Sequence, residues 1–166
     1  MLDTATTMPT TAFPGHLKVA FTTNSLLSVD ADFGTARQFV FYEVSAEATA
    51  FVDCVQFKDR PRGGGEGGGG EKKGGGRCCG GAPAPAVGSS IDARIEALRG
   101  TGLLFTLAMS DPQSVRVADL GVFPVKLAGA RSILEAVDRL QEMLRGTPPL
   151  WLQRAMRGSA ALDAVA

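Results

Sequence analysis

The chain of 166 residues is poor in the residues on which many catalytic and disulfide-rich proteins depend. It has three cysteines, Cys54, Cys78 and Cys79, which are too few for a disulfide scaffold. Its one histidine, His16, precedes the first predicted strand. A Ser/His/Asp catalytic triad or a Cys/His catalytic pair would have to use this residue. We therefore expect a binding protein and not an enzyme.

The chain also lacks an excess of charge and a long hydrophobic run. Its 17 Lys and Arg residues balance 17 Asp and Glu residues, which removes the broad attraction that nucleic acid or an anionic membrane exerts on a basic protein. No apolar run approaches the roughly 18 residues needed to cross a bilayer, and residues 1–14 do not resemble a signal peptide. The sequence predicts a cytoplasmic protein that binds neither nucleic acid nor membrane.

What is present is the composition of one globular domain, with 45% hydrophobic and 20% charged residues. We expect this domain to cover residues 16–157, with tails at 1–15 and 158–166. Within it, 12 of the 21 glycines lie between Gly63 and Gly81. Because such a stretch buries too little apolar surface to offset its ordering entropy, residues 63–88 are predicted to be an inserted, disordered loop.

The remaining segments alternate between strand and helix patterns. Strands are predicted at 17–23, 38–44, 50–57, 103–109 and 122–127, the second and third as an antiparallel pair and the last at a sheet edge because of Pro124. Helices are predicted to begin at Ser89 or Ser90, at Asp111 with Pro112, and at a capping box of Ser132 and Glu135. The order is βββαβαβα, which indicates an α/β fold with a five-stranded mixed sheet covered by helices.

The adjacent cysteines Cys78 and Cys79 are the most distinctive chemical feature. Thiolates are soft ligands for iron-sulfur and other thiophilic metal centres, but two adjacent cysteines lack the spacing of a zinc site. Basic residues outnumber acidic ones by six to three between Lys58 and Arg77, which favours the thiolate form. Two interpretations stay open, a metal-cluster site and a tract with incidental cysteines. Cys54 fits a small buried apolar residue of a strand.

Two enzyme-like patterns are weak. Asp30, Asp32 and Glu43 could supply the carboxylates of a metal-dependent nuclease, but Asp30 and Asp32 also suit turn residues that bond their own backbone. The glycines do not form a phosphate-binding loop, because no G-x-x-x-x-G-K-[ST] follows a strand.

Four segments together resemble the dinitrogenase iron-molybdenum cofactor biosynthesis family of the NifX type, and also the C-terminal domain of NifB. They are residues 32–39 (DFGTARQF), 94–98 (RIEAL), 121–126 (GVFPVK) and 146–152 (GTPPLWL). The resemblance implies a ribonuclease-H-like three-layer α/β/α fold with three main helices. It also implies a carrier that binds the iron-molybdenum cofactor or its iron-sulfur precursor without turnover. The implied partners are the precursor-synthesising enzyme, the maturation scaffold and apo-dinitrogenase.

The resemblance further implies a binding site in the loop after the first strand, with Asp32, Phe33, Gly34 and Arg37 as cofactor-binding residues. Many family members have histidine where this chain has Asp32, and imidazole binds iron or molybdenum more readily than a carboxylate does. We therefore expect Cys78 and Cys79 to act as metal ligands, with Arg37 offsetting the charge of the cluster. The alternative is a metal-independent interaction or regulatory protein for apo-dinitrogenase or the maturation scaffold. For this alternative, Trp151, Leu152 and Met156 could form an exposed patch or instead pack on the sheet.

Overall fold

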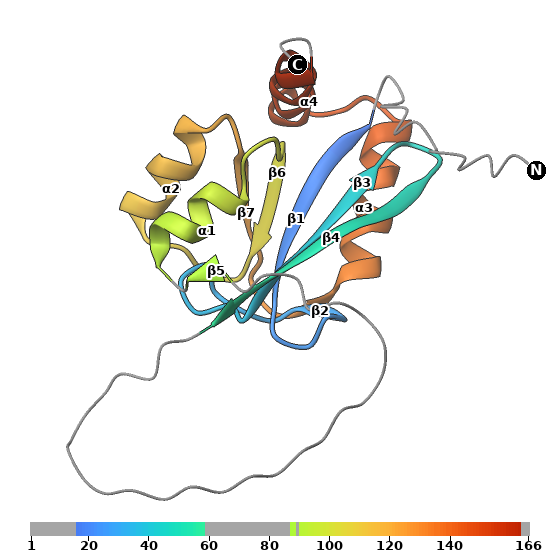
Figure 1. Cartoon of the computed structure of the whole chain (residues 1–166). Coiled ribbons are helices and arrows are strands. Elements are labelled where there is room, and N and C mark those ends of the chain that lie inside the picture. The colour runs from blue at the N-terminus through green and yellow to red at the C-terminus, as the bar shows by residue number, and fades with distance from the viewer. Residues whose placement is uncertain (1–15, 59–86, 89, 164–166) are drawn as a thin grey trace, which may run out of the picture.

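The structure, a computed structural model, describes residues 16–58, 87–88 and 90–163 (Figure 1). The five longer strands in these ranges are β1 (Leu17–Thr23), β3 (Gln38–Val44), β4 (Thr49–Lys58), β6 (Leu103–Thr106) and β7 (Phe123–Lys126). Three two-residue strands are β2 (Ser28–Val29), β5 (Val87–Gly88) and β8 (Arg131–Ser132). The helices are α1 (Ile91–Ala97), α2 (Asp111–Asp119), α3 (Ile133–Arg145) and α4 (Leu150–Asp163). The predicted N-terminal tail and residues 63–86 of the predicted loop, with Cys78 and Cys79, lie outside the described residues, whereas the last two residues of that loop form β5.

The longer strands form a mixed sheet in the order β4-β3-β1-β6-β7, with β5 beside the end of β4. β3 pairs antiparallel with both β1 and β4, whereas β6 pairs parallel with β1 and β7. The prediction of an α/β protein with a five-stranded mixed sheet is confirmed, and β7 takes the edge position expected from Pro124. β6 is shorter than predicted because the backbone after Thr106 bonds the loop before β3, through Leu107 N–H to the Ala31 oxygen.

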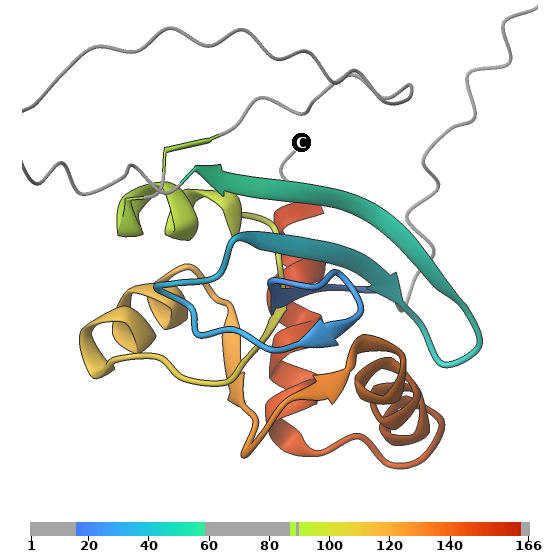
Figure 2. The same cartoon turned by 90° about the horizontal axis from the view of Figure 1, so that it is seen from below.

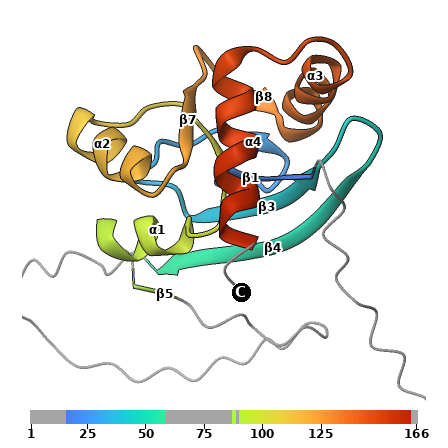
Figure 3. The same ribbon diagram turned by 90° about the horizontal axis from the view of Figure 1, so that it is seen from above.

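Helices cover both faces of this sheet, which gives three layers. One buried cluster joins the sheet to α1 and α2 through Ile95, Leu98 and Val117, and the other joins it to α3 and α4 through Leu140 and Leu152. Figures 2 and 3 both show α1 and α2 to the left, α3 to the right and α4 across the middle. No helix in the described ranges is long and apolar enough to cross a membrane.

Two helix starts differ from their predictions. Ser110, and not Asp111, caps α2: its hydroxyl accepts from the Gln113 N–H, and its own N–H donates to the Gln113 side chain in return. The predicted capping box at α3 is wrong, because the Ser132 side chain makes no capping bond. Ser132 instead lies in β8, and the Ile133 N–H donates to the Leu27 oxygen at 2.9 Å. A backbone acceptor from a distant loop thus replaces the side-chain cap.

The helix α4 has no counterpart among the predicted elements, and it runs past residue 157. It crosses the end of the sheet at which β1, β6 and β7 begin, opposite β2 (Figure 1). Leu152 is fully buried, and the Trp151 ring stacks on Phe123 with centroids 5.0 Å apart. Met156 also packs against the core. These residues therefore pack down on the sheet and form no exposed patch.

The close approach of α4 depends on Gly102, which precedes β6. A Cβ atom at this position would collide with Leu17 Cδ1 and would lie 3.2 Å from the Ala155 carbonyl oxygen. Leu17 is itself fully buried in the core. We expect Gly102→Ala to lower the free energy of unfolding by about 1–3 kcal/mol, the usual cost of overpacking. Urea denaturation would measure it, with Gly129→Ala as control because no atom lies within 4 Å there. Equal stability of the two variants would contradict this account of the contact.

Candidate functional site

The predicted cofactor-binding residues lie on the loop 24–37, which joins β1 to β3 at the edge of the sheet where the parallel strands end. Figure 2 views the molecule from this edge. Asp32 starts a tight turn, since its carbonyl oxygen accepts from the N–H groups of Thr35 and Ala36 at 3.2 and 2.9 Å. The Phe33 N–H donates to the Ala108 oxygen just beyond β6 at 2.9 Å. The turn is thus attached to the central strands, in the place where open α/β sheets commonly bind ligands.

The four predicted residues differ in what they present to a ligand. Asp32 and Arg37 are exposed, and Gly34 is half-buried. Phe33 is fully buried, with its ring packed on Phe39 at 5.5 Å between centroids. The side chains available to a ligand are therefore those of Asp32 and Arg37, whereas Phe33 anchors the turn in the core.

Arg94 of α1 binds the backbone of this turn, a role that was not predicted from the sequence. Its side chain is fully buried, and Nη1 donates to the carbonyl oxygens of Phe33 and Ala36 at 3.3 and 2.6 Å. The guanidinium also lies over the ring of Phe57, 4.4 Å from its centroid. Buried charged groups need such partners because desolvation is costly. One sequence signal was present: Arg94 falls on the apolar face of its helix, three residues after Ile91 and four before Leu98.

The described residues on either side of the glycine-rich segment lie next to this turn. Phe57 is the residue before the last in β4, and its N–H donates to the Arg37 carbonyl oxygen at 2.8 Å. The chain is described again at β5, which pairs with the end of β4. A Cβ atom on Gly34 would lie 3.8 Å from Ile91 Cδ1, in the first turn of α1. The described residues that flank the segment with Cys78 and Cys79 therefore lie beside the predicted cofactor-binding residues.

Cys54 is a poor candidate for a metal ligand. It is half-buried in β4, and its pKa is raised by burial and, to a smaller extent, by the neighbouring carboxylate of Asp53. The thiol is therefore protonated at neutral pH. No group of three or more His, Cys, Asp or Glu residues that could hold a metal ion occurs in the described part of the chain.

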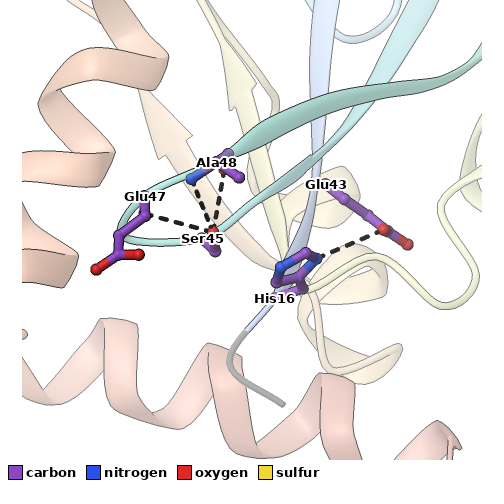
Figure 4. Close-up of polar contacts among 5 residues, drawn as sticks. All are labelled: His16, Glu43, Ser45, Glu47 and Ala48. Atoms are coloured by element: carbon purple, nitrogen blue, oxygen red, sulfur yellow. Dashed lines mark hydrogen bonds and ion pairs between the residues drawn. The ribbon is translucent and has the colours of Figure 1, made fainter. Parts of the chain in front are cut away.

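The carboxylates considered for a nuclease do not converge. Asp30 Oδ1 accepts from the Asn24 N–H at 2.7 Å, which is the turn interaction expected from its sequence context. Glu43 pairs with Lys18 at the other end of β1, and its Oε2 lies 3.7 Å from His16 Nδ1 (Figure 4). The same view shows Ser45, Glu47 and Ala48 in the turn between β3 and β4. This end of the sheet is separated from the loop 24–37 by the length of β1. Glu43 therefore cannot share a catalytic site with Asp30 and Asp32, as a nuclease would require.

Comparison with known proteins identifies the family. The model of the dinitrogenase iron-molybdenum cofactor family matches residues 15–143. The chain belongs to this family. It is 31% identical to the protein NifX of Rhodobacter capsulatus and 32% identical to NifX of Herbaspirillum seropedicae, over 86% and 85% of its length and 80% and 82% of theirs. It is also 27% identical to NifY of Azotobacter vinelandii, of which it covers half.

Membership of the dinitrogenase iron-molybdenum cofactor family confirms the resemblance drawn from the four segments, and it assigns the chain to nitrogenase cofactor biosynthesis in nitrogen fixation. The matched range includes the turn at Asp32, Arg94 and the glycine-rich segment. It ends before α4, so Trp151, whose ring stacks on Phe123, lies outside the family match.

Proposed function

We propose that the chain binds the iron-molybdenum cofactor, or its iron-sulfur precursor, and carries it between proteins of the biosynthetic pathway without catalysing a reaction. The observation that carries this proposal is the family match over residues 15–143, which includes the exposed turn at the carboxyl edge of the sheet. Buried anchors hold that turn, namely Phe33 and the guanidinium of Arg94. A rigid support of this kind suits a binding site, because the loop loses little conformational entropy when the ligand binds.

In this proposal Cys78 and Cys79 provide thiolate ligands, while Asp32, Gly34 and Arg37 line the site and Phe33 positions it. Seven residues lie between Cys79 and Val87, and Val87 pairs with β4 beside Arg37. The eight residue steps from Cys79 to Val87 span up to about 29 Å when fully extended. This length supports the proposal that Cys79 reaches the turn at Asp32. Arg37 is exposed there and offers a permanent positive charge to an anionic cluster.

We also propose that the fold is ribonuclease-H-like. Support comes from the sheet order β4-β3-β1-β6-β7, with the first three strands antiparallel and the last two added in parallel. In a carrier on this fold, the partners would be the precursor-synthesising enzyme, the maturation scaffold and apo-dinitrogenase, all met in the cytoplasm.

A transfer experiment tests this function. The protein would be loaded anaerobically with purified cofactor, desalted and mixed with apo-dinitrogenase. We expect nitrogenase activity in proportion to the amount of loaded protein, reaching about one active site per chain, as for a carrier without turnover. Absence of activation after desalting would overturn the proposal, and activation exceeding the cofactor supplied would show that the chain is not a simple carrier.

The alternative is a metal-independent interaction or regulatory protein. Its sequence motivation included an exposed apolar patch at Trp151, Leu152 and Met156, and these residues instead pack on the sheet. Anaerobic pull-down separates the two functions. A carrier should bind apo-dinitrogenase differently with and without cluster, whereas an interaction protein should retain the same partner in both conditions.

A further inference from the structure

A pocket lies at the same edge of the sheet as the turn at Asp32, but on the other face of the sheet. It has a volume of about 190 Å³ and lies between the ends of β6 and β7 and the helix α3. Phe105 and Ala136, both nearly fully buried, and the half-buried Met143 give it an apolar floor. The turn at Asp32 faces the core beneath α1 and α2, whereas Phe105 and Ala136 belong to the core beneath α3 and α4. The pocket is therefore separate from the proposed cluster site.

The charged residues around this pocket are mainly basic. Lys126 at the end of β7, Arg131 of β8 and Arg139 of α3 line it, against the single carboxylate of Glu135. Arg139 pairs with Glu142 at 3.2 Å. The side chains of Lys126 and Arg131 form no ion pair with any residue that the structure describes. Two cations from different strands are thus available to a ligand at the rim of an apolar hollow.

Most of the acidic residues near α3 lie outside this pocket. Asp138 and Glu142 line a neighbouring, more open hollow, the outer hollow, which shares Arg131, Glu135 and Arg139 with the pocket. An anion in this outer hollow would meet three carboxylates, whereas one in the inner pocket meets Lys126 and Arg131 with only Glu135 opposite. The charge pattern therefore favours binding in the inner pocket, which is large enough for several carbon atoms, since a water molecule takes about 30 Å³.

We propose that this pocket binds a small organic carboxylate. The guanidinium of Arg131 suits a carboxylate group because its donors form a planar fork that matches the two oxygens, and Lys126 adds a second positive charge. The carbon chain of the ligand lies against Phe105, Ala136 and Met143. This site needs no metal and uses none of the residues assigned to the cluster, so its existence can be tested independently of the proposed function.

Titration of the purified protein with glutarate, citrate and inorganic phosphate, followed by calorimetry and by the NMR signal of the Met143 methyl group, tests the proposal. We expect saturable binding of at least one carboxylate with a dissociation constant below about 1 mM, a shift of the methyl signal, and weaker binding of phosphate. Arg131→Gln and Lys126→Gln should each weaken carboxylate binding at least about tenfold, because each removes a charge-assisted hydrogen bond. Glu135→Gln should strengthen it by removing the facing carboxylate.

The matched control is Arg145→Gln. Arg145 is an exposed cation of α3, the helix that lines the pocket, but it lies outside the pocket. This substitution should leave the affinity unchanged, as should replacement of Cys78 and Cys79 by Ser. No saturable binding of any carboxylate to the unmodified protein would overturn the proposal. So would equal affinities of the Arg131→Gln, Lys126→Gln and Arg145→Gln variants, since that result would indicate a general effect of ionic strength.

Discussion

Replacement of Arg94 by Ala should lower the free energy of unfolding by about 3 kcal/mol. The substitution leaves a cavity beside Phe57 and removes the donor to the carbonyl oxygens of Phe33 and Ala36, which stay buried. Urea denaturation measures the effect. Arg99→Ala is the matched control on the same chain segment, because Arg99 and its partner Glu96 are both exposed, and we expect little change there. A loss no larger than that of the control would contradict the anchoring role of Arg94.

Two milder variants separate anchoring from packing alone. Arg94→Met keeps most of the volume but donates no hydrogen bond, and Arg94→Lys keeps the charge but loses the planar fork. If Arg94 anchors the turn, both variants should speed hydrogen exchange at the Ala36 N–H, which donates to the Asp32 oxygen within it. Exchange at Val40, within the strand β3, should change less. Uniform acceleration across the chain would indicate general destabilisation and not local release of the turn.

The double substitution of Cys78 and Cys79 by Ser should reduce affinity for the precursor cluster by more than about a hundredfold. Removing even an outer-shell partner of a metal site costs about 10–100-fold, and here the proposed ligands themselves are exchanged for hydroxyls that remain protonated. Iron retained after anaerobic desalting would measure the loss.

Cys54→Ser provides the matched control, since the pKa of Cys54 is raised and its thiol lies half-buried in β4. It should bind the cluster as the unmodified protein does. Unchanged affinity of the Cys78/Cys79 double variant would exclude these residues as ligands and direct attention to Asp32, while leaving the carrier function itself intact.

Much of the fold follows from local sequence patterns. The strands β1, β3, β4 and β6 were predictable from apolar and β-branched runs, and the edge position of β7 from Pro124. α4 was missed because Pro148 and Pro149 indicated a stop and no capping signal followed. Its apolar residues are held by tertiary contacts, of which the approach to Gly102 is one. The start of α3 was misjudged for a similar reason, because its backbone partner, Leu27, lies far away in sequence.

The candidate site was predictable only in outline. The segment around Asp32 could be singled out from the sequence, but the burial of Phe33 and the exposure of Arg37 depend on how the loop packs. The role of Arg94 required the positions of two carbonyl oxygens from a segment about 60 residues away in sequence. The pocket at Lys126 and Arg131 is likewise a product of tertiary structure, since it joins the ends of two strands to a helix.

The most direct test of the central claim is an anaerobic titration of the purified protein with the iron-sulfur precursor cluster, read by absorption spectroscopy and by iron content after desalting. The account predicts a saturable cluster absorption and about one cluster retained per chain. A protein that leaves the desalting column without iron and without an absorption band, although folded, would contradict it.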